Sequence, residues 1–200
     1  MVSERTASIT RETGESRVEV HLCLDVTGHF EIHTGICMLD HLLAALARHS
    51  LMDMTVTAHG DYEVDEHHTA EDVALVLGRA LNEALGERKG IARMGHAIVP
   101  MDEALALVAV DLGGRPYAVV EASFSGHKIG SLPADLVRHM LETLALEARM
   151  NLHARLLSGT NDHHRAEALF KALARALGAA SRLDPRVGKA SPSTKGTIDV

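Results

Sequence analysis

The sequence predicts an α+β fold in which an internally duplicated half-domain places mixed sheets against a layer of helices. Segments with alternating apolar residues and segments with helical spacing follow one another in the same order in each half of the chain. Short motifs of the first half also recur at matching places in the second half, which is typical of an internal repeat. With 46% hydrophobic residues among 200, the chain has enough apolar side chains to bury a core.

The first half is predicted to begin with a strand over residues 17–25, because apolar side chains occupy every second position from Val18 to Leu24. Its last helix is expected to begin at Thr69, which forms a capping-box pattern with Asp72 three residues later. The elements between and after them are, in order, a short strand near Phe30 and Ile32, a helix over 38–49, a strand over 54–58 and the continuation of the last helix to about Leu85.

The second half repeats this order. Gly113-Gly114-Arg115-Pro116 marks a turn between two strands, and Pro133 fits the first turn of a helix because proline has no N–H to leave unpaired there. The predicted elements are strands over 91–99, 104–112 and 117–123, a helix from Pro133 to Met150, a strand over 152–156 and a helix over 164–180. We expect one domain, residues 1–200, made of two repeats at about 1–90 and about 91–184 on one mixed sheet, with a functional C-terminal tail at 185–200.

The composition excludes several classes of protein. The formal net charge of −7 argues against a nucleic-acid-binding surface, which needs a basic footprint. The longest apolar run, Ala104 to Val110, is far shorter than the roughly 20 residues that span a bilayer, and the N-terminus has no apolar signal core. Cys23 and Cys37 lack CxxC spacing. We therefore expect a soluble, reduced, cytoplasmic protein that binds neither nucleic acid nor membrane.

Histidine is the unusual residue of this chain, at 14 of 200 positions. Each half contains a His-His-x-x-Glu motif, His67-His68-x-x-Glu71 and His163-His164-x-x-Glu167, and the two copies are 96 residues apart. A further histidine precedes each motif, His41 in the first half and His139 in the second. One isolated histidine pair is typical of a surface or a helix cap, but a second copy at the equivalent place, again with a glutamate, indicates metal binding.

The spacing within each motif limits how a metal is held. The glutamate follows the first histidine by four residues and the second by three, so we expect all three to share a helical face near the helix N-terminus. Adjacent helical residues diverge by about 100°, so both histidines of a pair do not easily chelate one ion. Each pair then serves two different metals, or one metal and the substrate. Imidazole and carboxylate ligands suit Mn, Fe, Co, Ni or Zn, and the residue types leave this choice open.

The segments that carry these motifs resemble the imidazoleglycerol-phosphate dehydratases, lyases of histidine biosynthesis. The matching segments are LDHLLAALARHS, DEHHTAEDVALVLGRAL, PMDEALA, DLGGRPY, GTNDHHRAEALFKALARAL and PSTKG. They run in family order from Arg5 to about Ile198, so the resemblance covers nearly the whole chain. It implies a duplicated half-domain like domain 2 of ribosomal protein S5, a carbon–oxygen hydro-lyase activity, and a homo-oligomeric shell of roughly 24 subunits with active sites shared between subunits.

The resemblance also implies residue roles. Glu12, in the Arg11-Glu12-Thr13 block, is implied as the general base. Two Mn²⁺ ions per active site are implied, with the ligands His41, His67, His68, Glu71, His139, His163, His164 and Glu167. The implied contacts to the substrate, an imidazole phosphate, are Glu12, His41, His49, His67, His68, Glu71, Arg93, Arg115, His163, His164, Glu167, Ser193, Thr194 and Lys195. Guanidinium and ammonium groups are the expected phosphate partners, although by composition alone Arg115 is a turn residue and Lys195 a tail residue.

The implied reaction is the dehydration of D-erythro-imidazoleglycerol phosphate to imidazoleacetol phosphate. Two metals on the ring nitrogens would stabilise an imidazolate, which expels the adjacent hydroxyl to give a diazafulvene, and Glu12 would remove the proton from the next carbon. The sequence leaves open which group protonates the hydroxyl, and which subunit supplies each ligand. Two alternatives also remain: a different dimetal lyase or hydrolase, and a metal store or sensor, although strands between the helices disfavour a ferritin-like store.

Overall fold

A computed structural model describes residues 5–198 and confirms the predicted α+β class. The first half contains β1 (Thr6–Glu12), β2 (Ser16–Cys23), β3 (Phe30–His33), α1 (Cys37–Ser50), β4 (Asp53–Gly60) and α2 (His67–Leu85). The second half contains β5 (Met94–Met101), β6 (Ala104–Asp111), β7 (Tyr117–Glu121), β8 (Lys128–Ile129), β9 (Leu132–Pro133), α3 (Ala134–Glu147), β10 (Asn151–Ser158) and α4 (Asp162–Ser181).

The two halves fold into equivalent mixed sheets. The first sheet has the order β1-β2-β4-β3 and the second β5-β6-β10-β7. In each, one outer pair is parallel (β3 with β4, β7 with β10) and the other pairings are antiparallel. The expectation of a single mixed sheet is therefore wrong, because each half pairs its own four strands and closes its own sheet.

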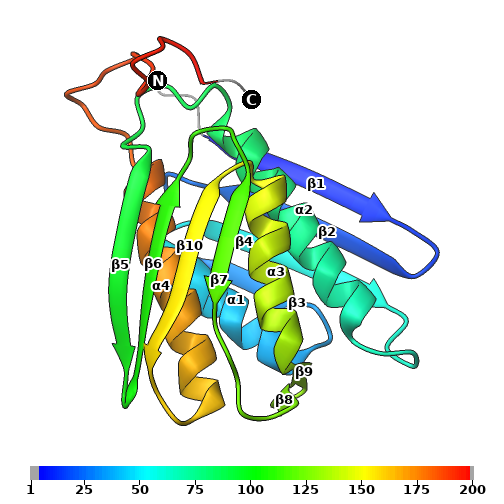
Figure 1. Ribbon diagram of the computed structural model, residues 1–200. Coiled ribbons are helices and arrows are strands. Elements are labelled where there is room, and N and C mark those ends of the chain that lie inside the picture. Colours follow the sequence, from blue (N-terminus) through cyan, green and yellow to red (C-terminus); the bar gives the residue numbers. More distant parts are fainter. Residues whose placement is uncertain (1–4, 199–200) are drawn as a thin grey trace.

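The four long helices lie between the two sheets (Figure 1). Helices α1 and α2 pack on the first sheet and α3 and α4 on the second, while α1 contacts α4 and α2 contacts α3. This arrangement buries the apolar faces of the sheets and helices in one continuous core, which is built mainly from Ala, Leu, Val and Met. Gly78 permits the close approach of α2 to α3, since a Cβ there would lie 2.6 Å from the Cβ of Glu147. Within residues 5–198, no helix is long and apolar enough to cross a membrane.

Several predicted boundaries need correction. Strand β1 precedes the strand predicted at 17–25, and the two-residue strands β8 and β9 precede α3; none of the three is predicted by the sequence pattern. Pro133 stands before the first residue of α3 rather than inside its first turn, and α3 ends at Glu147 rather than Met150. The strand predicted from Ile91 begins at Met94.

The N-termini of α2 and α4 begin in the same way, two residues before the expected positions. In α2 the backbone N–H of His67 donates to Oδ1 of Asp65 (2.8 Å), and in α4 the N–H of His163 donates to Oδ1 of Asn161 (2.9 Å). A short polar side chain thus satisfies an N–H that the helix leaves unpaired. Thr69 lies inside α2 and does not begin it, so the capping-box prediction is wrong. Both helices therefore start at the first histidine of the pair or one residue before it.

Candidate metal centre and substrate pocket

The first group of metal-ligand side chains joins α1 to α4. His41 projects from the second turn of α1, and His163 and Glu167 share one face of α4 because they are four residues apart. Oε1 of Glu167 is 3.1 Å from Nε2 of His41 and 2.9 Å from Nε2 of His163. We call these three residues the α1–α4 cluster.

The second group joins α2 to α3 with nearly the same geometry. Nε2 of His139, on α3, is 3.0 Å from Oε1 of Glu71, and Nε2 of His67 is 3.9 Å from Oε2 of Glu71. The rings of His67 and His139 lie 5.3 Å apart at 30°, and those of His41 and His163 lie 5.4 Å apart at 30°. We call His67, Glu71 and His139 the α2–α3 cluster.

Each cluster combines the two halves of the chain. The α1–α4 cluster takes one histidine from the first half and two residues from the second, and the α2–α3 cluster does the reverse. In each cluster one ligand atom per residue lies within 4.8 Å of the others. Ligand atoms about 2.0–2.2 Å from a shared ion have nearly this spread. Two imidazoles and one carboxylate therefore fit a divalent transition-metal ion that has further positions open for other ligands.

The second histidine of each pair lies outside the clusters. The rings of His67 and His68 lie 6.2 Å apart at 82°, as do those of His163 and His164. The expectation that both histidines share the glutamate's face is therefore wrong: only the first of each pair contacts the glutamate. Within residues 5–198, neither second histidine joins the group of ligand atoms formed by the cluster beside it, as the 100° divergence predicts.

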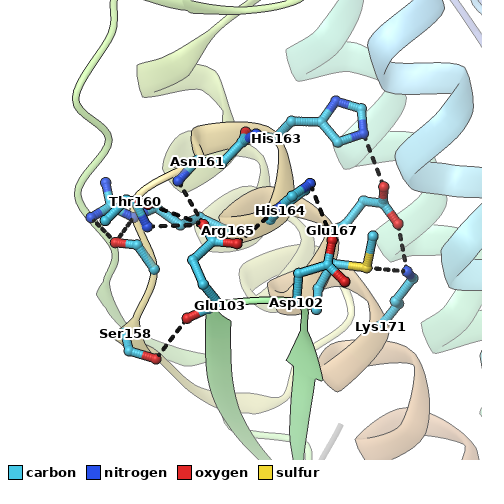
Figure 2. Close-up of polar contacts among 12 residues, drawn as sticks. Asp102, Glu103, Ser158, Thr160, Asn161, His163, His164, Arg165, Glu167 and Lys171 are labelled. Atoms are coloured by element: carbon cyan, nitrogen blue, oxygen red, sulfur yellow. Dashed lines mark hydrogen bonds and ion pairs between the residues drawn. The ribbon is translucent and has the colours of Figure 1, made fainter.

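Carboxylates hold both second histidines. Nδ1 of His68 lies 3.1 Å from Oδ2 of Asp61, and Nδ1 of His164 lies 2.7 Å from Oε2 of Glu103. Hydrogen bonding to these carboxylates raises the pKa of both histidines above its ordinary value. In Figure 2, His164 and Glu103 lie beside the loop of Thr160 and Asn161.

A lysine distinguishes the α1–α4 cluster from the α2–α3 cluster. Lys171, four residues after Glu167, forms an ion pair with its Oε2 atom and lies 3.2 Å from the sulfur of Met101 (Figure 2). Burial raises the pKa of Glu167, but the hydrogen bonds from Lys171 and His41 outweigh this effect and lower the pKa to about 2. Leu75 stands at the equivalent place after Glu71. The sites are therefore related by the repeat but differ in charge.

Five residues implied in substrate binding line a separate pocket. This pocket of about 170 Å³ is lined by Arg93, Arg115, Ser193, Thr194 and Lys195, together with Gly113, Thr197 and Ile198. The Arg93 guanidinium donates two bonds to the Asp111 carboxylate (2.7 and 2.9 Å) and one to the carbonyl of Pro192 (3.1 Å). The hydrogen bonds to Asp111 raise the pKa of Arg93. Arg115 and Lys195 are exposed, so their charges are available to a phosphate.

The β1–β2 turn presents a different glutamate from the one expected. Glu12, the last residue of β1, accepts a hydrogen bond from Arg17 at 3.0 Å and lies on the exposed edge. Glu15, directly before β2, has its Oε2 atom 3.8 Å from Nδ1 of His68. Among the described residues, Glu15 is thus the glutamate of this turn that contacts a predicted metal ligand.

His49 lies in the last turn of α1, facing α4. Its partial burial, followed by the positive charges of Lys171 and Arg175, lowers its pKa. His49 follows His41 of the α1–α4 cluster by eight residues, or about 12 Å along α1, and its side chain is exposed.

Sequence reasoning missed four residues of this site: Glu15, Asp61, Glu103 and Lys171. Two of them had a usable signal. Lys171 follows Glu167 by one helical turn, and Glu103 lies in the PMDEALA segment. Asp61 and Glu15 belong to turns, whose side chains reach a site only through tertiary structure.

Known proteins are similar to this chain in sequence and in fold. Residues 34–177 match the family model for imidazoleglycerol-phosphate dehydratase. An imidazoleglycerol-phosphate dehydratase of Chloroflexus aggregans is 58% identical over 198 residues, covering 99% of this chain and 97% of that protein. One of Dehalococcoides mccartyi is 58% identical, covering 99% and 100%. The crystal structure of the Staphylococcus aureus dehydratase has a TM-score of 0.81 at 35% identity, covering 90% of this chain and 99% of that one. The resemblance seen in the sequence is thus confirmed, and the chain belongs to the imidazoleglycerol-phosphate dehydratase family.

Proposed function

We propose that this protein dehydrates D-erythro-imidazoleglycerol phosphate to imidazoleacetol phosphate, a step of L-histidine biosynthesis, with two Mn²⁺ ions per active site. The observation that carries this proposal is the pair of matching His-His-Glu clusters in a chain of this family. A pocket lined by arginine, lysine and serine supplies the second requirement, a place for the phosphate. Free Cys23 and Cys37 are in keeping with a cytoplasmic location.

Eight residues would hold the two ions: the six cluster residues and the second histidine of each pair, His68 and His164. When bound, two cations would supply positive charge that favours loss of the substrate's ring proton. The electron-rich ring could then expel the hydroxyl from the adjacent carbon. The chain's own residues orient the ring, hold the phosphate and move the protons.

The phosphate would be held by charge and by oriented donors. Arg115 and Lys195 are the exposed cations of the pocket, and Ser193 and Thr194 add hydroxyl donors. The bonds from Arg93 to Asp111 fix its guanidinium plane in the lining of the pocket. Residues 185–200 would therefore form a functional tail, of which the structure describes the part up to Ile198.

The structure favours Glu15 over Glu12 as the base that removes the proton from the second carbon. Glu15 is next to His68, whereas Glu12 is occupied by Arg17 at the sheet edge. The side chain of Glu15 is 59% exposed, so it can reach a substrate that binds beside His68. The proton and the departing hydroxyl together form water, and the resulting enol becomes the ketone. Lys171, which forms an ion pair with Glu167, would contact the substrate hydroxyls.

Distances within one chain support active sites shared between copies. The backbone N–H of Arg93 donates to the carbonyl of Ala180, at the C-terminal end of α4 (2.8 Å), whereas Glu167 lies near its N-terminal end. Ala180 lies thirteen positions after Glu167 along the helix, a rise of about 20 Å. A ring, three carbons and a phosphate span roughly 10 Å at ordinary bond lengths. The pocket of one chain would therefore serve the cluster of another.

The α2–α3 cluster also lies at the opposite end of its helix from the C-terminal tail. Gly90, beyond the C-terminal end of α2, bonds Ala190 of the tail, while Glu71 lies near the N-terminal end of the same helix. Figure 1 accordingly shows the tail at the top of the molecule, beyond the C-terminal ends of α2 and α4.

The outer faces of the two sheets support a homo-oligomer, for which we propose a shell of roughly 24 subunits. The outer face of the first sheet is polar, with Thr10 and Glu19 as examples. The outer face of the second sheet carries the exposed side chains of Met94, Ile98 and Tyr117. An exposed apolar sheet face is typical of a surface that another protein chain covers.

Turnover of imidazoleglycerol phosphate by the purified, metal-stripped protein, with and without added Mn²⁺, tests the proposed function. We expect formation of imidazoleacetol phosphate only after the metal is restored. Turnover that persists after chelation and dialysis would contradict the metal role. Mn²⁺ binding without turnover would favour a metal store or sensor, and turnover of another imidazole or phosphate compound alone would favour a different dimetal lyase or hydrolase.

A further inference from the structure

The contact between Glu103 and His164 is built more firmly than a surface ion pair. Oε1 of Glu103 accepts hydrogen bonds from the backbone N–H groups of Thr160 (3.0 Å) and Asn161 (2.7 Å), the loop that leads into α4. Its other oxygen, Oε2, accepts a hydrogen bond from Nδ1 of His164 (2.7 Å; Figure 2). The carboxylate therefore fixes the loop and the imidazole ring together.

A carboxylate can only accept at this contact, so Nδ1 of His164 carries the proton. In a neutral ring the lone pair is then on Nε2, the nitrogen available to bind a metal. The nearest carboxylate to that nitrogen is Asp102, whose Oδ2 lies 3.7 Å away, beyond hydrogen-bonding distance. Nε2 of His164 makes no hydrogen bond within residues 5–198.

His68 is held in the same way by a different element. Both carboxylate oxygens of Asp61, in the loop after β4, lie 3.1–3.2 Å from its Nδ1 atom. The backbone N–H of Asp61 donates to the carbonyl of Glu15 (3.0 Å), which ties this loop to the β1–β2 turn. Nε2 of His68 has no hydrogen-bond partner in the described part of the chain either.

The duplication shows that two glutamates of equivalent position have diverged. Glu15 directly precedes β2 and Glu103 directly precedes β6, the equivalent strand of the second sheet, and each approaches Nδ1 of the second histidine of its half. In the second half Glu103 accepts the hydrogen bond from Nδ1 of His164. In the first half Asp61 accepts the hydrogen bond from Nδ1 of His68, and the exposed side chain of Glu15 lies 3.8 Å from the same nitrogen.

We propose that Asp61 and Glu103 are positioning residues, which hold Nδ1–H of His68 and His164 so that each ring offers Nε2 to a metal ion. Asp61 thereby leaves Glu15 free for proton transfer. This inference rests on the proposed function, in which both histidines are metal ligands. A carboxylate behind a metal-bound histidine fixes its tautomer and orientation, and its loss typically weakens metal binding about 10–100-fold.

Mn²⁺ affinity of the assembled, metal-stripped protein tests the proposal, measured by equilibrium dialysis against a competing chelator. We expect Glu103→Ala to weaken binding at the affected site about 10–100-fold and Glu103→Gln to weaken it less, because an amide oxygen still accepts from Nδ1–H. Asp61→Ala and Asp61→Asn should show the same order. Glu121→Gln is the matched control, since Glu121 is an exposed glutamate on β7 that pairs only with Arg155 in the described residues, and it should bind Mn²⁺ like the parent protein.

His164→Ala separates failure of this proposal from failure of the proposed function. If His164→Ala weakens Mn²⁺ binding and both Glu103 variants bind normally, the positioning role is wrong and the ligand assignment stands. If His164→Ala also binds normally, the ligand assignment itself is wrong. Glu103→Ala removes the acceptor of the loop at Thr160. If that variant does not fold, the Mn²⁺ affinity of Glu103→Gln is compared with that of the parent protein instead. Normal affinity in that variant, with a normal Glu121→Gln control and weakened His164→Ala, overturns the proposal.

Discussion

Replacing Asp72 should weaken the attachment of the β1–β2 hairpin to α2. Oδ1 of Asp72 accepts from Nε of Arg11 at 2.8 Å, and its Oδ2 accepts from the hydroxyl of Ser16. The Asp72 side chain is 12% exposed and that of Arg11 is 36% exposed, so solvent screens the ion pair only in part. Ser16 is buried beside Glu15, so this contact also sets the position of the proposed base.

The magnitude follows from these two bonds. A hydrogen bond to a charged group contributes about 1.5–3 kcal/mol, and partial exposure of Arg11 places its share at the lower end. We expect Asp72→Ala to lower the free energy of unfolding by about 3 kcal/mol, and Asp72→Asn, which keeps one acceptor oxygen, by about half of that.

Urea unfolding at fixed protein concentration measures this loss, with turnover assayed in parallel. Asp135→Ala is a suitable control, because Asp135 is exposed on α3 and forms no ion pair within residues 5–198. A double-mutant cycle of Asp72→Ala with Ser16→Ala should show coupling between the two positions. An Asp72→Ala protein within about 0.5 kcal/mol of the parent would refute the reasoning, since surface substitutions have effects of that size.

Three further predictions concern the base, a salt bridge and a helix contact. Glu15→Gln should lower kcat by about 10²–10⁴-fold while Glu12→Gln keeps it, and the reverse result would restore Glu12 as the base. The hydrogen bonds from Arg5 lower the pKa of Asp25, so the stability that this pair contributes is present above about pH 4 and is lost as pH falls through the lowered pKa. The free energy of unfolding of Asp25→Asn, measured across pH 2–5, should lack this loss. A pH profile identical to that of the parent protein would contradict the prediction. Gly78→Ala should reduce the free energy of unfolding by about 1–2 kcal/mol, because overpacking against α3 exceeds the gain in helix propensity; a more stable variant would be the contrary result.

Local patterns account for most of the fold but not for its sheets. Helical spacing of apolar residues predicts α1, because one face of that helix is buried. Strand β1 escapes prediction because, of its seven residues, only Ala7 is fully buried, and the others except Ile9 are polar. The division into two sheets depends on pairings such as β2 with β4, whose strands are separated by a helix, and no local pattern encodes that choice.

The candidate site shows the same division. The residue types and their duplication predict metal ligands, because His-His-x-x-Glu occurs twice in matching context. The sequence does not predict that His41 meets His163 across the halves, which depends on the packing of α1 against α4. It also assigns the base to Glu12, whereas the hairpin register pairs Glu12 with Arg17 and brings Glu15 to His68.

The central claim is that the cluster of one chain and the phosphate pocket of another form one active site. Activity of mixed assemblies tests it most directly, using Glu167→Ala and Lys195→Ala chains that carry different affinity tags and are co-expressed and purified together. Each variant alone should be inactive. Random mixing should restore about one quarter of the parent's specific activity, since half of the clusters and half of the pockets remain intact. Verified mixed assemblies that stay as inactive as their parents would contradict the account.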